Sequence, residues 1–156
     1  MSKSDNPTNP PLHKVRGWLL VLCINLIVVN PLWQVNYLVH FNTTLESMGT
    51  YGAVEGLEEL FYISLLFSLI IIFYSIKSGL GLVNIKTGAL ESAKKFLRNF
   101  AIYILLLIPI TFVIAPAYFE LCSDDLLKGT IESLIILGIG YAYLRYSKKV
   151  KAIYQT

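Results

Sequence analysis

The sequence predicts an all-α integral membrane protein, built as a bundle of four transmembrane helices with both termini in the cytoplasm. Composition is the first observation behind this prediction, because hydrophobic residues make up 55% of the 156 residues and charged residues only 15%. An ordinary soluble domain carries about 25% charged residues. The second observation is that long uncharged apolar stretches alternate with short charged segments. This pattern predicts a single membrane domain, spanning residues 15–147.

The charged segments are sorted by sign, and this sorting predicts the topology. Basic side chains lie in the N-terminal tail, in a middle segment and at the C-terminal end: Lys3, Lys14, Arg16, Lys77, Lys86, Lys94, Lys95, Arg98, Arg145, Lys148, Lys149 and Lys151. Acidic side chains lie mainly in the two intervening segments: Glu46, Glu55, Glu58, Glu59, Glu120, Asp124, Asp125 and Glu132. The exceptions are Lys128, Asp5 and Glu91. Because basic loops are retained in the cytoplasm, we expect an N-in, C-in topology with two acidic outer loops.

The first predicted span covers 17–39. It follows a cytoplasmic tail, 1–14, whose prolines and small polar residues predict disorder. The span carries no charge, and Trp18 and Trp33 are spaced to reach the two aromatic belts of a bilayer. Pro31 cannot donate a backbone hydrogen bond within a helix, so we expect a kink near the outer end of this span.

The second predicted span, 58–77, has the shortest uncharged core that can cross a bilayer, and Lys77 can extend it by snorkelling to the interface. A basic segment follows, in which apolar residues recur at helical spacing. We therefore expect an amphipathic helix over about 88–98 at the cytoplasmic surface, running into the next span. Within it, Glu91 and Lys95 are spaced to form an i,i+4 ion pair.

The third predicted span, 99–119, is twenty-one residues without a charge. Pro109 and Pro116 are seven residues apart and therefore lie on roughly one face of a helix. Because each removes one backbone donor, we expect the two prolines to bend this helix.

The fourth predicted span, 127–146, is the least apolar, because it includes Lys128 and Glu132. Two arguments favour a true span. Glu132 would lie in its outer first turn, where the helix dipole favours a carboxylate. Without this span the basic C-terminal tail, 148–156, would be stranded outside, against the charge bias.

Two segments of the chain resemble the DUF2569 family of small bacterial inner-membrane proteins. The first, RGWLLVLCINLIVVNPLW at 16–33, is similar to the family's opening Gly-Trp-Leu, apolar run and proline. The second, YLRYSKKVKAIYQT at 143–156, is similar to its closing Tyr-rich span and basic Ser-Lys-Lys-Val-Lys motif. The resemblance implies four transmembrane helices and a bacterial inner-membrane location. The family carries no assigned activity, so the resemblance implies no site residues.

The sequence predicts no catalytic residue, no cofactor and no metal site. The one cluster of metal-binding residue types is in the first outer segment and lacks ligand spacing: His40, Glu46, Glu55, Glu58 and Glu59. Catalysis by a serine or cysteine nucleophile would need a base nearby, and no such motif is present. Nucleic-acid binding is not expected either, because no separate basic domain exists to carry it.

Five uncharged residues within the spans are candidates for helix packing or for lining a polar path: Asn25, Asn30, Gln34, Gly138 and Ala142. Amides inside a membrane usually hydrogen-bond neighbouring helices, and small residues four apart let helices approach closely. No ionisable residue is expected at mid-depth, since Glu132 is placed at the interface. That absence counts against a proton-coupled pump.

The expected function is a non-enzymatic accessory or structural role through helix–helix interaction, either with a second copy or with another membrane protein. The alternative is a small oligomeric channel or transporter, and a membrane enzyme ranks below both. The expected partners are the bilayer itself and the anionic headgroups at its cytoplasmic face.

Overall fold

A computed structural model describes residues 15, 17–47 and 56–154, and all regular structure in these ranges is helical. The elements are α1 (Trp18–Ile24), a π-helical turn η2 (Asn25–Val29), α2 (Asn30–Ser47), α3 (Leu57–Val83), α4 (Ala89–Ile114), α5 (Pro116–Tyr146) and α6 (Lys148–Tyr154). Four stretches are long and apolar enough to cross a membrane: Trp18–Glu46, Leu57–Val83, Ala89–Ile114 and Cys122–Tyr146. The prediction of an all-α protein with four such helices is confirmed.

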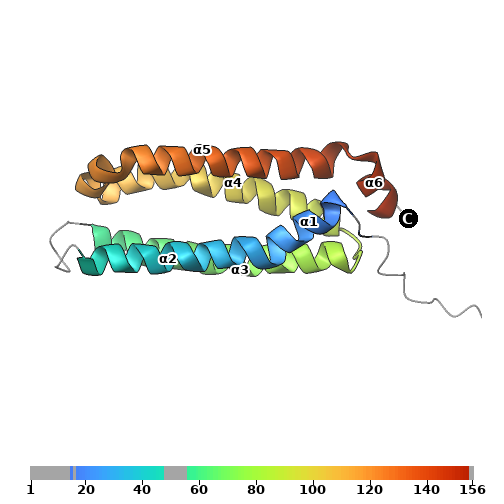
Figure 1. The fold of residues 1–156 in the computed structure, drawn as a ribbon, viewed down its shortest axis with the longest axis horizontal. Helices are drawn as coiled ribbons and strands as arrows, with labels where there is room; N and C mark the ends of the chain where they lie inside the picture. Colours follow the sequence, from blue (N-terminus) through green and yellow to red (C-terminus); the bar gives the residue numbers. More distant parts are fainter. Residues whose placement is uncertain (1–14, 16, 48–55, 155–156) are drawn as a thin grey trace, which may run out of the picture.

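The long helices lie side by side along one axis (Figure 1). Helices that follow one another in sequence pack together, so the main contacts join α2 to α3, α3 to α4 and α4 to α5. α5 therefore rests mainly on α4, and Figure 1 shows it in a separate layer from α1 and α2. The face between α2 and α5 is thereby left open.

The first span changes direction at the π-helical turn, and Figure 1 shows α1 leaning away from the line of α2 toward α4 and α5. The expected kink is thus present, although it is centred on Asn25–Val29 rather than near the outer end. Pro31 explains the position, because it cannot donate to the carbonyl four residues earlier. A π-helical turn just before the proline rearranges the backbone hydrogen bonds around that gap.

A row of buried serines on α3 joins it to the first span. The side chains of Ser64, Ser68 and Ser75 are fully buried. Ser75 Oγ donates to the carbonyl of Leu26 at 2.6 Å and accepts from Asn30 Nδ2 at 2.9 Å. Ser68 Oγ donates to Gln34 Oε1 at 3.0 Å. Hydroxyl and amide groups therefore hold the first two spans together along much of their length.

We expect Ser75→Ala to lower the free energy of unfolding by about 1–2 kcal/mol, because it leaves the Leu26 carbonyl and the Asn30 amide without partners. The measurement is unfolding of the detergent-solubilised protein with increasing sodium dodecyl sulfate. Ser92→Ala is the matched control, since Ser92 is exposed on α4. Equal losses for the two variants would contradict a structural role for the Ser75 hydrogen bonds.

The turn between α4 and α5 differs from the sequence prediction. α4 ends at Ile114 and α5 begins at Pro116, so the third span does not extend to Phe119. Pro109 lies inside α4, as expected, whereas the prediction that Pro116 bends the same helix is wrong. Proline suits the first position of a helix, where its missing N–H has no intrahelical partner. The second acidic segment is consequently the start of α5 and not a loop.

Both ends of the middle basic segment are helical. The amphipathic stretch from Ala89 onward is continuous with the third span in α4, as the apolar spacing predicted. The ion pair within it differs from the prediction, because Glu91 Oε1 contacts Lys94 Nζ at 2.8 Å and not Lys95. Lys95 is thus left without an ion-pair partner among the described residues.

The basic C-terminal segment forms the short helix α6, which packs on the end of the bundle next to α1 (Figure 1). Val150 is fully buried there. Tyr154 Oη donates to the carbonyl of Leu82 at 2.5 Å, in the last turn of α3, and the same carbonyl accepts from the Ile85 N–H at 3.3 Å. Burial raises the pKa of Tyr154, so this phenol stays protonated as a donor. These contacts fix the C-terminal segment to the bundle.

Candidate functional site: a groove between the first and last spans

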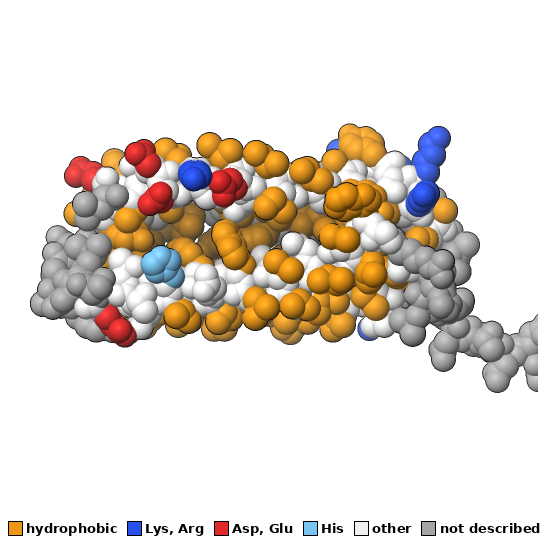
Figure 2. Space-filling view, viewed as in Figure 1, with side chains coloured by type: hydrophobic (Ala, Val, Ile, Leu, Met, Phe, Trp, Pro, Cys, Tyr) orange, Lys and Arg blue, Asp and Glu red, His pale blue; other side chains and the backbone are white. Residues whose placement is uncertain are grey.

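Three adjoining cavities form one groove along the open face between the first span and α5. Their volumes are about 290, 300 and 210 Å³. The first two share Asn25 and Ile136, and the last two share Trp33 and Ser133, so the groove is continuous. Figure 2 shows the hollow between the two layers on this side of the molecule.

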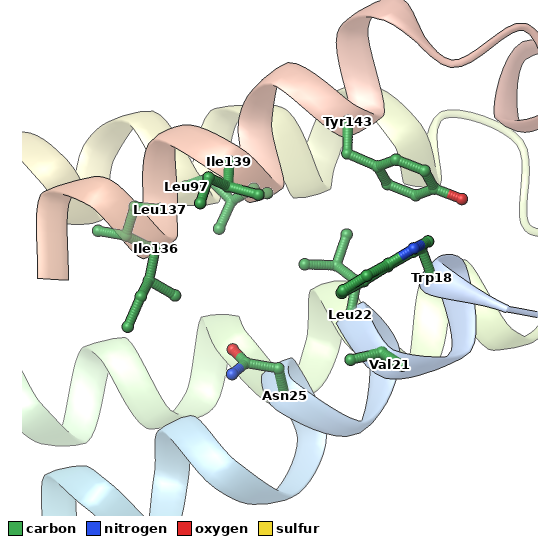
Figure 3. Close-up of a pocket in the computed structure, with 10 residues that line it drawn as sticks. Trp18, Val21, Leu22, Asn25, Leu97, Ile136, Leu137, Ile139 and Tyr143 are labelled. Atoms are coloured by element: carbon green, nitrogen blue, oxygen red, sulfur yellow. The ribbon is translucent and has the colours of Figure 1, made fainter. Parts of the chain in front are cut away.

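The end of the groove nearest α6 is almost entirely apolar (Figure 3). Trp18 and Tyr143 lie at its mouth, and Ile136 points from α5 toward the π-helical turn. Asn25 directs its amide into this space from the opposite wall. Gly140 has a packing role here, because a Cβ at this position would lie 3.3 Å from Leu22 Cδ1. The glycine therefore lets Leu22 approach α5 closely.

The middle of the groove contains an ionisable residue. Glu132 lines the same cavity as Asn25, Val29, Asn30 and Phe100, which lie well inside the first and third membrane spans. The prediction that Glu132 occupies the first turn of the last helix is wrong, because α5 begins sixteen residues earlier, at Pro116. A carboxylate at this level, facing amides and hydroxyls across an open groove, is a functional candidate.

The remaining end of the groove is more polar. It is lined by Gln34 and Tyr37 from α2 and by Asp125 and Thr130 from α5. Gln34 is only 5% exposed and already accepts a hydrogen bond from Ser68. Its carbonyl oxygen is consequently engaged in holding α2 to α3.

The structure divides the five candidate residues into two groups. Asn25, Asn30 and Gln34 all line the groove. Gly138 is exposed at a separate cavity beside Arg98, with no atom within 4 Å of where its Cβ would lie. Ala142 is half-buried and is not among the residues that line the groove.

The close helix approaches use different small residues. A Cβ at Gly79 would lie 2.5 Å from Ile27 Cγ1, so this glycine sets the distance between α3 and the π-helical turn. Gly140 does the same between α5 and α1. Gly79 follows Ser75 by four residues, and this small-residue pair could have predicted the contact, whereas no small residue lies four positions from Gly140. Glu132 could have been found by its charge inside a predicted span.

The family described as "Protein of unknown function (DUF2569)" matches residues 12–155, nearly the whole chain. The chain belongs to the DUF2569 family. The resemblance noted at its two ends is therefore confirmed over almost its full length. Comparison with curated proteins and with solved structures gave no match.

The chemistry open to this DUF2569 protein is set by the groove. Within 15, 17–47 and 56–154, no three His, Cys, Asp or Glu residues are grouped so that they could hold a metal ion. Glu55, a member of the acidic cluster considered above, lies outside the described residues. Cys23 and Cys122 are free thiols, and Cys23 is buried. What the groove offers is two carboxylates, three amides and several hydroxyls between apolar walls, which can accept and donate hydrogen bonds within a membrane.

Proposed function

We propose that this DUF2569 protein is a non-enzymatic accessory component of the membrane, and that its groove holds a transmembrane helix of a partner protein. One observation carries the proposal. In the most apolar part of α5 only 6% of the residues are buried within the chain, against 17–28% in the other three spans. The last span is also the least apolar of the four. A helix of this kind gains most from a protein neighbour.

The polar lining favours a helix over a lipid chain as the occupant. An acyl chain would leave the Glu132 carboxylate and the Asn25 amide without hydrogen-bond partners. A charged side chain facing lipid at the bilayer centre costs about 2.5–3.5 kcal/mol on insertion scales. A helix that presents a hydroxyl, amide or basic side chain at this level would remove that cost. The partner is therefore expected to carry hydrogen-bond donors near the middle of its membrane span.

Filling the groove tests the proposal. Ile136 and Ile135 are similarly exposed on α5, at 61% and 57%, but only Ile136 lines the groove. We expect Ile136→Trp to abolish co-purification of a partner whose transmembrane segment binds here, and Ile135→Trp to retain it. Gly138→Leu, outside the groove, should also retain it. A partner lost equally with all three variants, or with none, would contradict docking in the groove.

The position of Glu132 well inside the last membrane span supports a second candidate function. This candidate is a small oligomeric transporter with a proton-binding carboxylate. In a liposome assay, flux of an ion or solute driven by a pH gradient would support this candidate. Glu132→Gln separates the two functions, because glutamine keeps hydrogen-bonding capacity but cannot bind or release a proton. Loss of flux with an intact partner complex would favour transport, whereas the absence of flux in the unmodified protein would count against it.

We also propose that the protein lies in the bacterial inner membrane with both termini in the cytoplasm. Figure 2 supports the orientation, because acidic side chains gather at one end of the bundle and most basic ones at the other, although a basic side chain also lies among the acidic ones. The positive-inside rule places the basic end in the cytoplasm. A fluorescent or enzymatic reporter fused after Thr156 is expected to be active only in its cytoplasmic form. A signal from a periplasmic reporter at the same position would contradict this topology.

A further inference from the structure

A separate cavity lies between α3 and α4. Its volume is about 450 Å³, larger than each of the three cavities of the groove. α3 contributes Phe67, Ile70, Ile71, Tyr74 and Ser78, and the first half of α4 contributes the other wall. Phe100 and Tyr103, at its deep end, also line the groove. The polar residues at its other end do not, so they require a separate explanation: Ser78, Ser92, Lys95 and Asn99.

Polarity changes along the length of this cavity. Its polar residues lie near the α3–α4 connection: Ser78 in the last turns of α3, and Ser92, Lys95 and Asn99 in the first turns of α4. Its aromatic and aliphatic residues extend deeper, as far as Phe67 and Tyr103. From Ser92 to Tyr103 the helix rises by about 16 Å. A polar end next to a long apolar wall suits an amphiphile.

The polar end is positively charged. Lys95 is exposed, and the one ion pair found among the described residues joins its neighbour Lys94 to Glu91. Lys77 lies close by, because its Nζ is 5.9 Å from the ring centre of Tyr74, which lines the cavity. Two lysines therefore lie near the polar end, and the nearby carboxylate of Glu91 is already paired with Lys94.

Ser78 adds a hydroxyl to the polar end of the cavity. Its side chain is only 2% exposed and lines the cavity from α3. A serine hydroxyl can both donate and accept hydrogen bonds, so it can bind a ligand oxygen in the cavity.

We propose that this cavity binds an anionic phospholipid from the bilayer. Lys95 faces the phosphate, with Ser92, Asn99 and Ser78 as hydrogen-bond donors, and one acyl chain lies along Phe67, Ile70 and Phe100. Basic pockets between transmembrane helices on the cytoplasmic side are a recurring site for anionic headgroups. The long apolar wall of the cavity favours a lipid over a free phosphate as the ligand, because a soluble anion would leave the aromatic side chains of this wall uncovered.

Titration of the purified protein in detergent with phosphatidylglycerol or phosphatidylcholine, followed by native mass spectrometry, tests the site. We expect phosphatidylglycerol to bind more tightly, and Lys95→Gln to weaken its binding about fivefold. Arg98→Gln is the matched control, since Arg98 lies one turn further along α4 and lines a different cavity. Equal binding of the two lipids, or equal losses from both variants, would overturn the proposal.

A second pair of variants tests the acyl-chain end and leaves the charges unchanged. Ile70→Trp should fill the apolar wall and lower phosphatidylglycerol binding. Leu69→Trp, at an exposed position that does not line the cavity, should not. Competition by glycerol phosphate, the headgroup without its chains, distinguishes the source of the phosphate. Displacement of the lipid by glycerol phosphate at equal concentration, or no difference between the two Trp variants, would contradict a lipid site.

Discussion

Gly56→Ala is expected to destabilise the protein by about 3 kcal/mol or more, measured as the loss of unfolding free energy in mixed detergent micelles. Gly56 precedes α3 with φ +82°, a left-handed conformation that costs a residue with a Cβ about 1–2 kcal/mol. A Cβ built here would lie 1.6 Å from the carbonyl oxygen of Ile114, at the end of α4. The backbone of one of the two helices would therefore have to move.

Gly88 provides a control with the same backbone conformation and no neighbour. It precedes α4 with φ +77°, and no atom lies within 4 Å of where its Cβ would be. Gly88→Ala is therefore expected to cost only the backbone strain, about 1–2 kcal/mol. Equal losses for the two variants would contradict the close packing of the α2–α3 end against α4.

Gly79→Leu is the second substitution with a large expected effect. Its Cβ would overlap Ile27 Cγ1 at 2.5 Å and lie 3.1 Å from Leu26 Cβ. A leucine side chain would push the π-helical turn away from α3 and break the hydrogen bond from Ser75 to the Leu26 carbonyl. Overpacking typically costs about 1–3 kcal/mol, and loss of the buried hydrogen bond adds to it.

The unfolding of Gly79→Leu in sodium dodecyl sulfate measures this cost, with Gly138→Leu as the matched control. Gly138 is exposed on α5 and has open space at its Cβ position. The control should therefore unfold at nearly the same detergent fraction as the unmodified protein. If Gly138→Leu proves the more destabilising variant, the close approach of α3 to the first span is not a main source of stability.

Much of the fold could be predicted from the sequence, because a membrane imposes long uncharged helices that composition and charge order reveal. The amphipathic start of the third helix was also readable, since apolar residues from Leu90 onward recur at helical spacing. The serines at 64, 68 and 75 are spaced to share one face of a helix, and this signal could have identified the α2–α3 contact.

Helix ends were less predictable. A proline is compatible either with a kink inside a helix or with the first turn of a new one, and Pro109 and Pro116 adopt one role each. The predicted start of the fourth span, which was chosen from the charge pattern, placed Glu132 at the membrane interface. In the structure α5 begins earlier than this predicted span, and Glu132 lines a cavity together with Asn25 and Asn30. The groove itself depends on which helices pack together, which hydropathy does not report.

Site-specific photo-crosslinking from α5 tests whether a partner's transmembrane segment occupies the groove. A photoreactive amino acid at Ile136, inside the groove, is compared with one at Ile135, equally exposed but outside it. In native membranes, position 136 is expected to give an adduct to a transmembrane segment of a partner protein, near a residue that can donate hydrogen bonds, while position 135 reacts with lipid. Adducts to lipid alone, or only to a second copy of this chain, at position 136 would contradict docking of a partner in the groove.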